Sequence, residues 1–242
     1  MNNSAVRELD RAHVDLTVAS SGRRAAVRRW AWLGLVAQAV FVASLLLAAS
    51  WQGPRYNSVA HTISDMSAVT APHGALLVMV LTLCGAATIG FALQALWWAL
   101  RNGGWRAATG SVLLALSIVG LGDLLSPFER LACRMADPGC TATQQLSNTG
   151  GKLDNAISSL GLLLLVIAAF FLAGAMRRTH GWEGWASPTR WTAVVITSLG
   201  VASVLTQDAG YTGLFERLVA VTGAAALAVL AIGILRQTRD AT

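Results

Sequence analysis

Six long runs of apolar residues, joined by short polar connections, constrain this chain more than any other feature. A helix of about 20 apolar residues crosses the roughly 30 Å hydrocarbon core of a bilayer, and each run is long enough to do so. The composition agrees, because 55% of the 242 residues are apolar and only 12% are charged. The sequence predicts an all-α polytopic membrane protein, a bundle of six transmembrane helices. The spans are expected at about 30–50, 72–100, 105–125, 153–176, 188–206 and 214–235.

The spans form one predicted membrane domain, residues 30–236, between two polar tails, residues 1–29 and 237–242. The first apolar run is longer than the roughly 7–15 apolar residues of a signal peptide, which favours an uncleaved span. We expect Pro72 and Pro188 to open the second and fifth helices, because the missing N–H of proline is tolerated at a first helical position.

Basic residues in the connections predict the orientation of the spans. Most of the eighteen lysines and arginines lie in the two tails and in the connections after the second and fourth spans. The positive-inside rule makes this side cytoplasmic, so both termini are predicted to be cytoplasmic. Because these charges are spread over connections and not gathered on one face, they do not indicate nucleic acid. The expected partners are membrane lipids, and the abundance of arginine, alanine and glycine favours a bacterial plasma (inner) membrane.

A polar segment between the first two spans carries the residues most suited to chemistry. It occupies residues 56–72 and reads YNSVAHTISDMSAVTAP. On a helical wheel Ser58, His61, Ser64 and Asp65 share one face, and apolar side chains gather on the other. This pattern predicts a short amphipathic helix at the membrane surface. An ordinary solvated helix face would give the same pattern.

Ionisable residues near the ends of the spans are further candidates, because a charge in or near hydrocarbon is costly and suggests a function. All of them lie toward the predicted outer side, so we expect an outward-facing polar pocket for a lipid or small ligand. The candidate ligand-binding residues are His61, Asp65, His73, Asp123, Asp154, Asn155, Ser158, Glu216 and Arg217.

Several of these candidates also have a structural explanation. Asp154 lies in a first helical turn, where the helix dipole favours a carboxylate. Glu216 and Arg217 can lie in the headgroup region. Asp123 lies at the end of its span where the dipole disfavours negative charge, so a cationic partner is expected. The candidates for that partner are Arg217, Arg130 and His73.

An enzyme would use His61, Ser64, Asp65 and Asp123 as its catalytic residues. A serine nucleophile needs its base within reach, which only the fold decides. Zinc is a weaker alternative, with His61, His73 and Asp123 as ligands, because no HxxxH or CxxC pattern supports it. No cofactor is therefore expected.

Cysteines and glutamines complete the set of predicted contacts. Cys133 and Cys140 lie in one predicted outer loop, where the oxidising side of the membrane favours a disulfide over two free thiols. Cys84, inside a span, is expected to pack as a small apolar residue. Gln38 and Gln94 are expected to hydrogen-bond between helices.

Three short motifs resemble a known family. They are YNSVAHTISDMSA after the first span, FERLACRMADPGC after the third and GLFERL at the start of the last. Over about residues 30–236 the chain resembles the bacterial six-span membrane family called domain of unknown function 998. That resemblance implies a histidine early in the fourth span, where this chain has Asp154, which argues against histidine-dependent chemistry. The layout is also distantly similar to the alkaline ceramidase and adiponectin-receptor hydrolases, but their paired histidines are missing and their activity is not inferred.

Three functions are consistent with these features. The first is a non-catalytic membrane protein that binds a lipid or small ligand or assists a membrane complex; it predicts a pocket open to lipid with apolar walls. The second is an outward-facing hydrolase or transferase acting on a lipid-like substrate, which predicts that the catalytic candidates converge. The third is a small transporter, which predicts polar residues that continue to the inner side.

Overall fold

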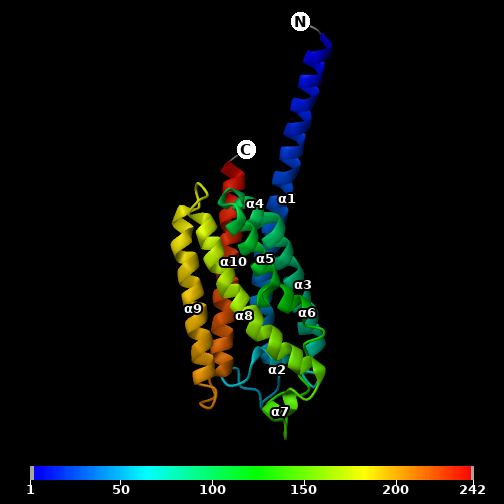
Figure 1. Cartoon of the computed structure of the whole chain (residues 1–242). Coiled ribbons are helices and arrows are strands. Elements are labelled where there is room, and N and C mark those ends of the chain that lie inside the picture. The colour runs from blue at the N-terminus through cyan, green and yellow to red at the C-terminus, as the bar shows by residue number, and fades with distance from the viewer. Residues whose placement is uncertain (1–2, 241–242) are drawn as a thin grey trace.

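The computed structural model describes the backbone of residues 3–240 and the side chains of residues 22–239. Every regular element in that part of the chain is a helix, and the long helices run side by side along one bundle (Figure 1). The prediction of an all-α membrane bundle is therefore confirmed. α1 (Asn3–Ser50) begins and α10 (Thr212–Asp240) ends toward the same end of the molecule. We call the opposite end the distal end.

Five helical stretches within residues 3–240 are long and apolar enough to cross a membrane. They are Gly22–Ser50, Gly74–Ala99, Trp105–Leu125, Thr149–Met176 and Thr212–Arg239.

The predicted fifth span is not among these five stretches. It corresponds to α9 (Ala186–Leu205), which follows the short turn η4 (Glu183–Trp185) and lies beside α8 (Thr149–Met176) and α10. Arg190 and several hydroxyl residues make α9 less apolar than the five stretches that meet the length and hydropathy criteria. The count of six spans therefore stays a prediction.

The second span is an α-helix that widens before it ends. α3 (Gly74–Gly90) continues as the π-helix η1 (Phe91–Leu96) and then as α4 (Trp97–Ala99). The 3-10 turn η2 (Arg101–Gly103) then reverses the chain.

The third span is broken near its middle, which its apolar pattern does not reveal. α5 (Trp105–Leu116) stops at Ser117, whose backbone is extended, and the chain resumes as the π-helix η3 (Ile118–Gly122) and α6 (Asp123–Leu125). Irregular backbone at membrane depth is tolerated where protein covers it. Here α8 covers the break, because a Cβ on Gly161 would lie only 2.7 Å from the Ile118 nitrogen.

Close helix contacts and an apolar core fill the half of the bundle nearer the termini. A Cβ on Gly110 would lie 2.8 Å from Cγ of Leu172, so glycine is needed where α5 and α8 approach each other. The core there includes Leu100, Met176 and Trp182, all of them buried.

Two long connections cover the distal end, and we call them together the distal cap: residues 51–73 and 126–148 (Figure 1). The first contains α2 (Ile63–Ser67), which contacts α1, α3 and α10. The second contains α7 (Ala142–Gln145).

The amphipathic helix predicted for residues 56–72 is wrong except for the five residues of α2. Residues 58–61 form a turn and a bend, and residues 56 and 57 have no regular structure. Both faces of α2 are covered, because the polar Asp65 and the apolar Met66 are each 0% exposed. The wheel assumed a helix with one free face, whereas the bundle and the rest of the cap enclose this one.

The predicted helix starts at the two prolines also need correction. α3 begins at Gly74 after His73, which adopts a left-handed conformation with a φ of 53°. α9 begins at Ala186, two residues before Pro188. Proline fits the whole first turn of a helix, so its presence does not decide the first residue.

Candidate functional site

Arg217 on α10 fastens the first connection of the cap to the bundle. Its Nη1 donates hydrogen bonds of 2.8 Å to the carbonyl oxygens of Ser58, His61 and Gly213, and its Nη2 donates to the Tyr56 hydroxyl. A guanidinium offers five donors in one plane, which suits it to hold several acceptors of one loop. Burial raises the pKa of Tyr56 above its usual 10.0, although Arg217 opposes this rise.

Glu216, the neighbour of Arg217, supports the start of α2. Its Oε2 accepts the Ile63 N–H at 2.9 Å. Thr62 and Asp65 form a capping box: the Thr62 hydroxyl accepts the Asp65 N–H at 3.2 Å, and the Asp65 Oδ2 accepts the Thr62 N–H at 3.1 Å. The first N–H groups of a helix have no partner within it, so these acceptors supply what α2 lacks.

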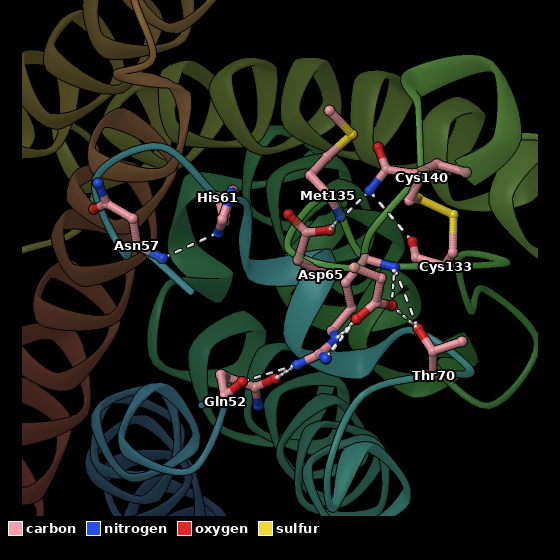
Figure 2. Close-up of polar contacts among 11 residues, drawn as sticks. Gln52, Asn57, His61, Asp65, Thr70, Cys133, Met135 and Cys140 are labelled. Carbon is pink, nitrogen blue, oxygen red and sulfur yellow. Dashed lines mark hydrogen bonds and ion pairs between the residues drawn. A yellow bond between two sulfur atoms is a disulfide. The ribbon is translucent and has the colours of Figure 1, made fainter. Parts of the chain in front are cut away.

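Asp65 also joins the two connections of the cap. Its Oδ1 accepts the Met135 N–H at 2.9 Å and the side-chain amide of Gln145 at 2.7 Å, as Figure 2 shows. A fully buried carboxylate is tolerated when donors surround it. Both oxygens of Asp65 therefore accept hydrogen bonds, and the residue holds the two connections of the cap together.

Arg130 binds the other end of α2. Its Nε donates to the Ser67 carbonyl at 2.9 Å, and its Nη2 donates to the Ala68 carbonyl at 2.8 Å. A cation at this position compensates the unpaired carbonyls and the negative pole of the helix.

An ion pair and a disulfide close the loop after Arg130. Arg134 pairs with Asp137, which also accepts the Thr70 hydroxyl (Figure 2). Burial raises the pKa of Asp137, but the hydrogen bonds from Arg134 and Thr70 outweigh burial and hold this pKa below its usual value. Cys133 and Cys140 form a disulfide with their Cα atoms 6.1 Å apart, so that prediction is confirmed.

A second group of acidic residues lies between the cap and the bundle. Asp154 on α8 accepts the Ser64 hydroxyl at 2.9 Å. Glu129 of the cap is 7% exposed, and its Oε1 has no hydrogen-bond partner among residues 22–239. Burial, with a contribution from Asp154, raises the pKa of Glu129 to about 8.

Asp123 does not have the cationic partner predicted for it. Arg217 and Arg130 bind backbone carbonyls, and His73 is exposed and lies edge-on to Trp51 with ring centroids 5.8 Å apart. No cation among residues 22–239 is within salt-bridge distance of Asp123. The prediction is wrong because the arginines serve the loops of the cap.

The other predicted site residues are dispersed over the distal end. Nδ1 of His61 accepts the Asn57 N–H at 3.0 Å (Figure 2), so this nitrogen does not face Ser64. On α8 Asn155 is exposed and Ser158 is half-buried. Within the described side chains, no three histidine, cysteine, aspartate or glutamate residues are grouped as metal ligands.

The two glutamines predicted to lie between helices behave differently. Gln38 on α1 donates a 3.0 Å hydrogen bond to the Thr88 hydroxyl on α3, as expected. Gln94 is exposed on η1, so the prediction is wrong for this residue. Cys84 is buried and unpaired with another cysteine, in agreement with a packing role.

Two hollows on the described part of the surface differ in character. An open depression of about 400 Å³ lies on the distal cap and includes Gln52, Arg55, Arg134 and Asp137. It contains none of the predicted ligand-binding residues. A crevice of about 80 Å³ lies between α5, α8, α9 and α10. Its walls include Leu114, Leu165, Ala168, Ala169, Leu172, Trp185, Pro188, Thr189, Thr192, Ile196, Gly223, Ala226, Leu227, Val229 and Leu230.

Sequence reasoning overlooked Glu129 and Gln145. Both residues lie in the long connection after the third span and not in or beside an apolar run. The FERLACR motif, which contains Glu129, was a usable signal, because it places Glu129 beside the structural Arg130.

These features define a polytopic helical membrane protein whose polar contacts are gathered in a cap at one end. A model of a family described as "Protein of unknown function (DUF998)" matches residues 35–233. The chain therefore belongs to the DUF998 family, which confirms the resemblance seen in its motifs. No curated protein and no solved structure matches it.

Proposed function

We propose that this chain is a non-catalytic integral membrane protein that binds an acyl chain of a membrane lipid. The observation that carries the proposal is the apolar crevice between α8, α9 and α10. These helices lie in the part of the bundle expected to face hydrocarbon, so an acyl chain is the occupant that the surroundings supply.

The two threonine hydroxyls in the crevice already have acceptors one turn earlier in the chain. The Thr189 hydroxyl donates to the Trp185 carbonyl at 2.9 Å, and the Thr192 hydroxyl donates to the Pro188 carbonyl at 3.1 Å. A polar ligand would therefore find few free hydrogen-bonding groups, whereas an apolar one leaves no polar group unpaired.

The size of the crevice limits what it holds. Its 80 Å³ is about half of the roughly 150 Å³ of an apolar cavity that holds benzene. The crevice therefore accepts a segment of one chain and not a whole lipid. Small residues such as Ala168 and Gly223 leave the space. Lipid tails are as apolar as leucine, so close packing supplies the affinity.

We also propose an orientation and a location for the protein in the membrane. Most of the basic residues lie at the end of the bundle near the termini, which favours cytoplasmic termini and an outward-facing distal cap. The crevice includes Trp185 in η4 and Pro188 in the first turn of α9, so we place it in the cytoplasmic half. The arginine-rich composition supports a bacterial plasma membrane.

The enzyme and transporter alternatives receive less support. Ser64 donates to Asp154 and Nδ1 of His61 accepts a backbone N–H, so these two do not form a nucleophile and base. Gln94, expected to extend a polar path, is exposed on the outside of η1.

A lipid analogue with a photoreactive acyl chain tests the proposal in nanodiscs. A Cβ on Gly223 meets only Leu165, at 4.0 Å, so Gly223→Leu fits the backbone and fills the crevice. We expect cross-linking to residues of α8, α9 and α10 to fall roughly tenfold, equivalent to about 1.4 kcal/mol.

Ala225→Leu is the matched control, because Ala225 is exposed on the same helix and does not line the crevice. It should cross-link like the wild type. Equal cross-linking of wild type and Gly223→Leu, spread evenly over the lipid-facing helices, would refute a defined acyl-chain site.

A further inference from the structure

Three acidic residues from separate segments lie near one another where the distal cap rests on the bundle; Glu129 is buried, and Asp123 and Asp154 are half-buried. Asp123 belongs to α6, Asp154 to α8 and Glu129 to the cap. Glu129 is the informative member, since it is 7% exposed and its Oε1 has no partner among residues 22–239. A buried acceptor without a donor is rare in folded proteins and calls for an unseen proton or ligand.

The backbone around Glu129 lies directly against the first turn of α8. A Cβ on Gly150 would come 2.5 Å from the Arg130 carbonyl oxygen, which also accepts the Asn148 side-chain amide at 3.1 Å. Asp154 follows Gly150 by four residues and therefore lies on the same face of α8. This contact brings Glu129 to Asp154.

Asp123 reaches the same place through two successive turns. The Ser126 N–H donates to the Asp123 carbonyl, and the Glu129 N–H donates to the Ser126 carbonyl, both at 3.3 Å. α3 closes the other side, because a Cβ on Gly85 would lie 2.9 Å from the carbonyl carbon of Asp123. The cap and two elements of the bundle thus border the acidic group on three sides, with Glu129 buried and the two aspartates half-buried.

The cations around Asp123, Glu129 and Asp154 do not neutralise these acidic residues. Arg130 binds the carbonyls at the end of α2, Arg217 binds those of the first connection, and Lys152 on α8 is exposed. The charged and titratable groups on the surrounding elements are Asp65 on α2, Cys84 on α3, Lys152 on α8, Glu216 and Arg217 on α10, and His73, Arg130, Arg134 and Asp137 in the cap.

We infer that Glu129, Asp154 and Asp123 form a proton-binding site that fastens the distal cap to the bundle. A carboxyl that keeps its proton is neutral and can donate to a neighbouring carboxylate. Without that proton, like charges face each other across the contact between cap and bundle. Release of the proton therefore loosens residues 126–148.

The pKa of Glu129 agrees with this inference and sets the pH range. Its ordinary value is 4.5, and burial beside Asp154 raises it to about 8. Between these values the folded protein holds a proton that the unfolded chain has lost. Stability therefore decreases as the pH rises through this range, and the loss is complete above the pKa of the folded state.

Thermal unfolding of the full-length protein in detergent, between about pH 5 and pH 9, tests the inference. We expect the unfolding temperature of the wild type to fall by several degrees as the pH rises. Glu129→Gln should remove most of this dependence, because the amide donates without ionising. Glu183→Gln, at an exposed residue of η4, is the matched control and should keep the wild-type slope.

Two further measurements separate a proton from other occupants. The infrared band of protonated carboxyl groups should be present in the wild type at neutral pH and weaker in Glu129→Gln. Asp154→Asn keeps an acceptor for Ser64 and removes one negative charge, so it should move the pH transition to lower pH. These readouts keep the inference testable if Glu129→Gln folds poorly.

Three outcomes would overturn the inference. One is a wild-type unfolding temperature that does not change over this pH range. Another is a slope that Glu129→Gln leaves intact. The third is stabilisation of the wild type at high pH by sodium or calcium chloride, but not by choline chloride, and its loss in Glu129→Gln; that result would assign the site to a metal cation.

Discussion

Asp65 and Glu129 are both buried acidic residues of the distal cap, but their surroundings differ. Both oxygens of Asp65 accept hydrogen bonds, from the Thr62, Met135 and Gln145 donors. Glu129 has an oxygen with no donor among residues 22–239. Burial therefore has opposite consequences. Asp65 connects two segments through its hydrogen bonds, whereas Glu129 favours its protonated form.

Asp65→Asn tests the structural role at the residue scale. The substitution turns one acceptor oxygen into a donor that faces other donors, so at least one buried hydrogen bond is lost. We expect a loss of about 3 kcal/mol in the free energy of unfolding. Asp208→Asn, at an exposed residue of the turn between α9 and α10, should change it by less than about 0.5 kcal/mol. Denaturant unfolding in detergent measures both, and equal stabilities would contradict the role given to Asp65.

The break in the third span is the clearest feature at the scale of the element. Ser117 ends α5, and its carbonyl accepts the N–H groups of Gly120 and Gly122 as the π-helix begins. The turn exists because Gly120 lacks a Cβ, which would collide with the Ala115 carbonyl oxygen. The break redirects the last turn of the span, α6, and so places Asp123 nearer to Glu129 and the cap.

Two alanine substitutions in this turn should have different effects. Gly120→Ala introduces the collision with Ala115, and we expect it to destabilise the fold by about 2 kcal/mol. Gly122→Ala places its Cβ 3.4 Å from the nearest atom, of Ile118, and should be nearly neutral. Thermal unfolding of the two variants in one detergent gives the comparison. A neutral Gly120→Ala would show that the break does not depend on this glycine.

At the scale of the whole molecule, α9 decides how many times the chain crosses the membrane. It lies beside α8 and α10 in the bundle (Figure 1) but is less apolar than the five stretches that satisfy the length and hydropathy criteria within residues 3–240. With α9 as a span, the parallel arrangement of the bundle agrees with termini on one side of the membrane.

Cysteine labelling at the two ends of α9 tests the sixth span. Gly184 precedes the helix with no atom near its missing Cβ, and Asp208 follows it in an exposed turn. In intact cells an impermeant maleimide should label Asp208→Cys and not Gly184→Cys, which should react only after lysis. Labelling of both, or of neither, in intact cells would place the two ends on one side and refute the crossing by α9.

The sequence by itself determined the class of the protein and the position of most of its spans. Apolar runs such as the one ending α1 have no stable place in water, so their length and order predict a membrane bundle without any knowledge of packing. The disulfide of the cap was predicted from two cysteines in one outer loop, and the family from three short motifs. The break at Ser117 was not predicted, because an apolar run has the same sequence pattern whether or not its helix is continuous.

Only the tertiary structure decided what each polar residue does. Arg217 and Asp123 were both candidates from the same rule, yet one binds three carbonyls and the other has no cation within salt-bridge distance among residues 22–239. Glu129 became a candidate only when the fold set it against α8. The reason is that the cost of a buried charge depends on the donors and charges within a few ångströms, and residues far apart in the sequence supply them.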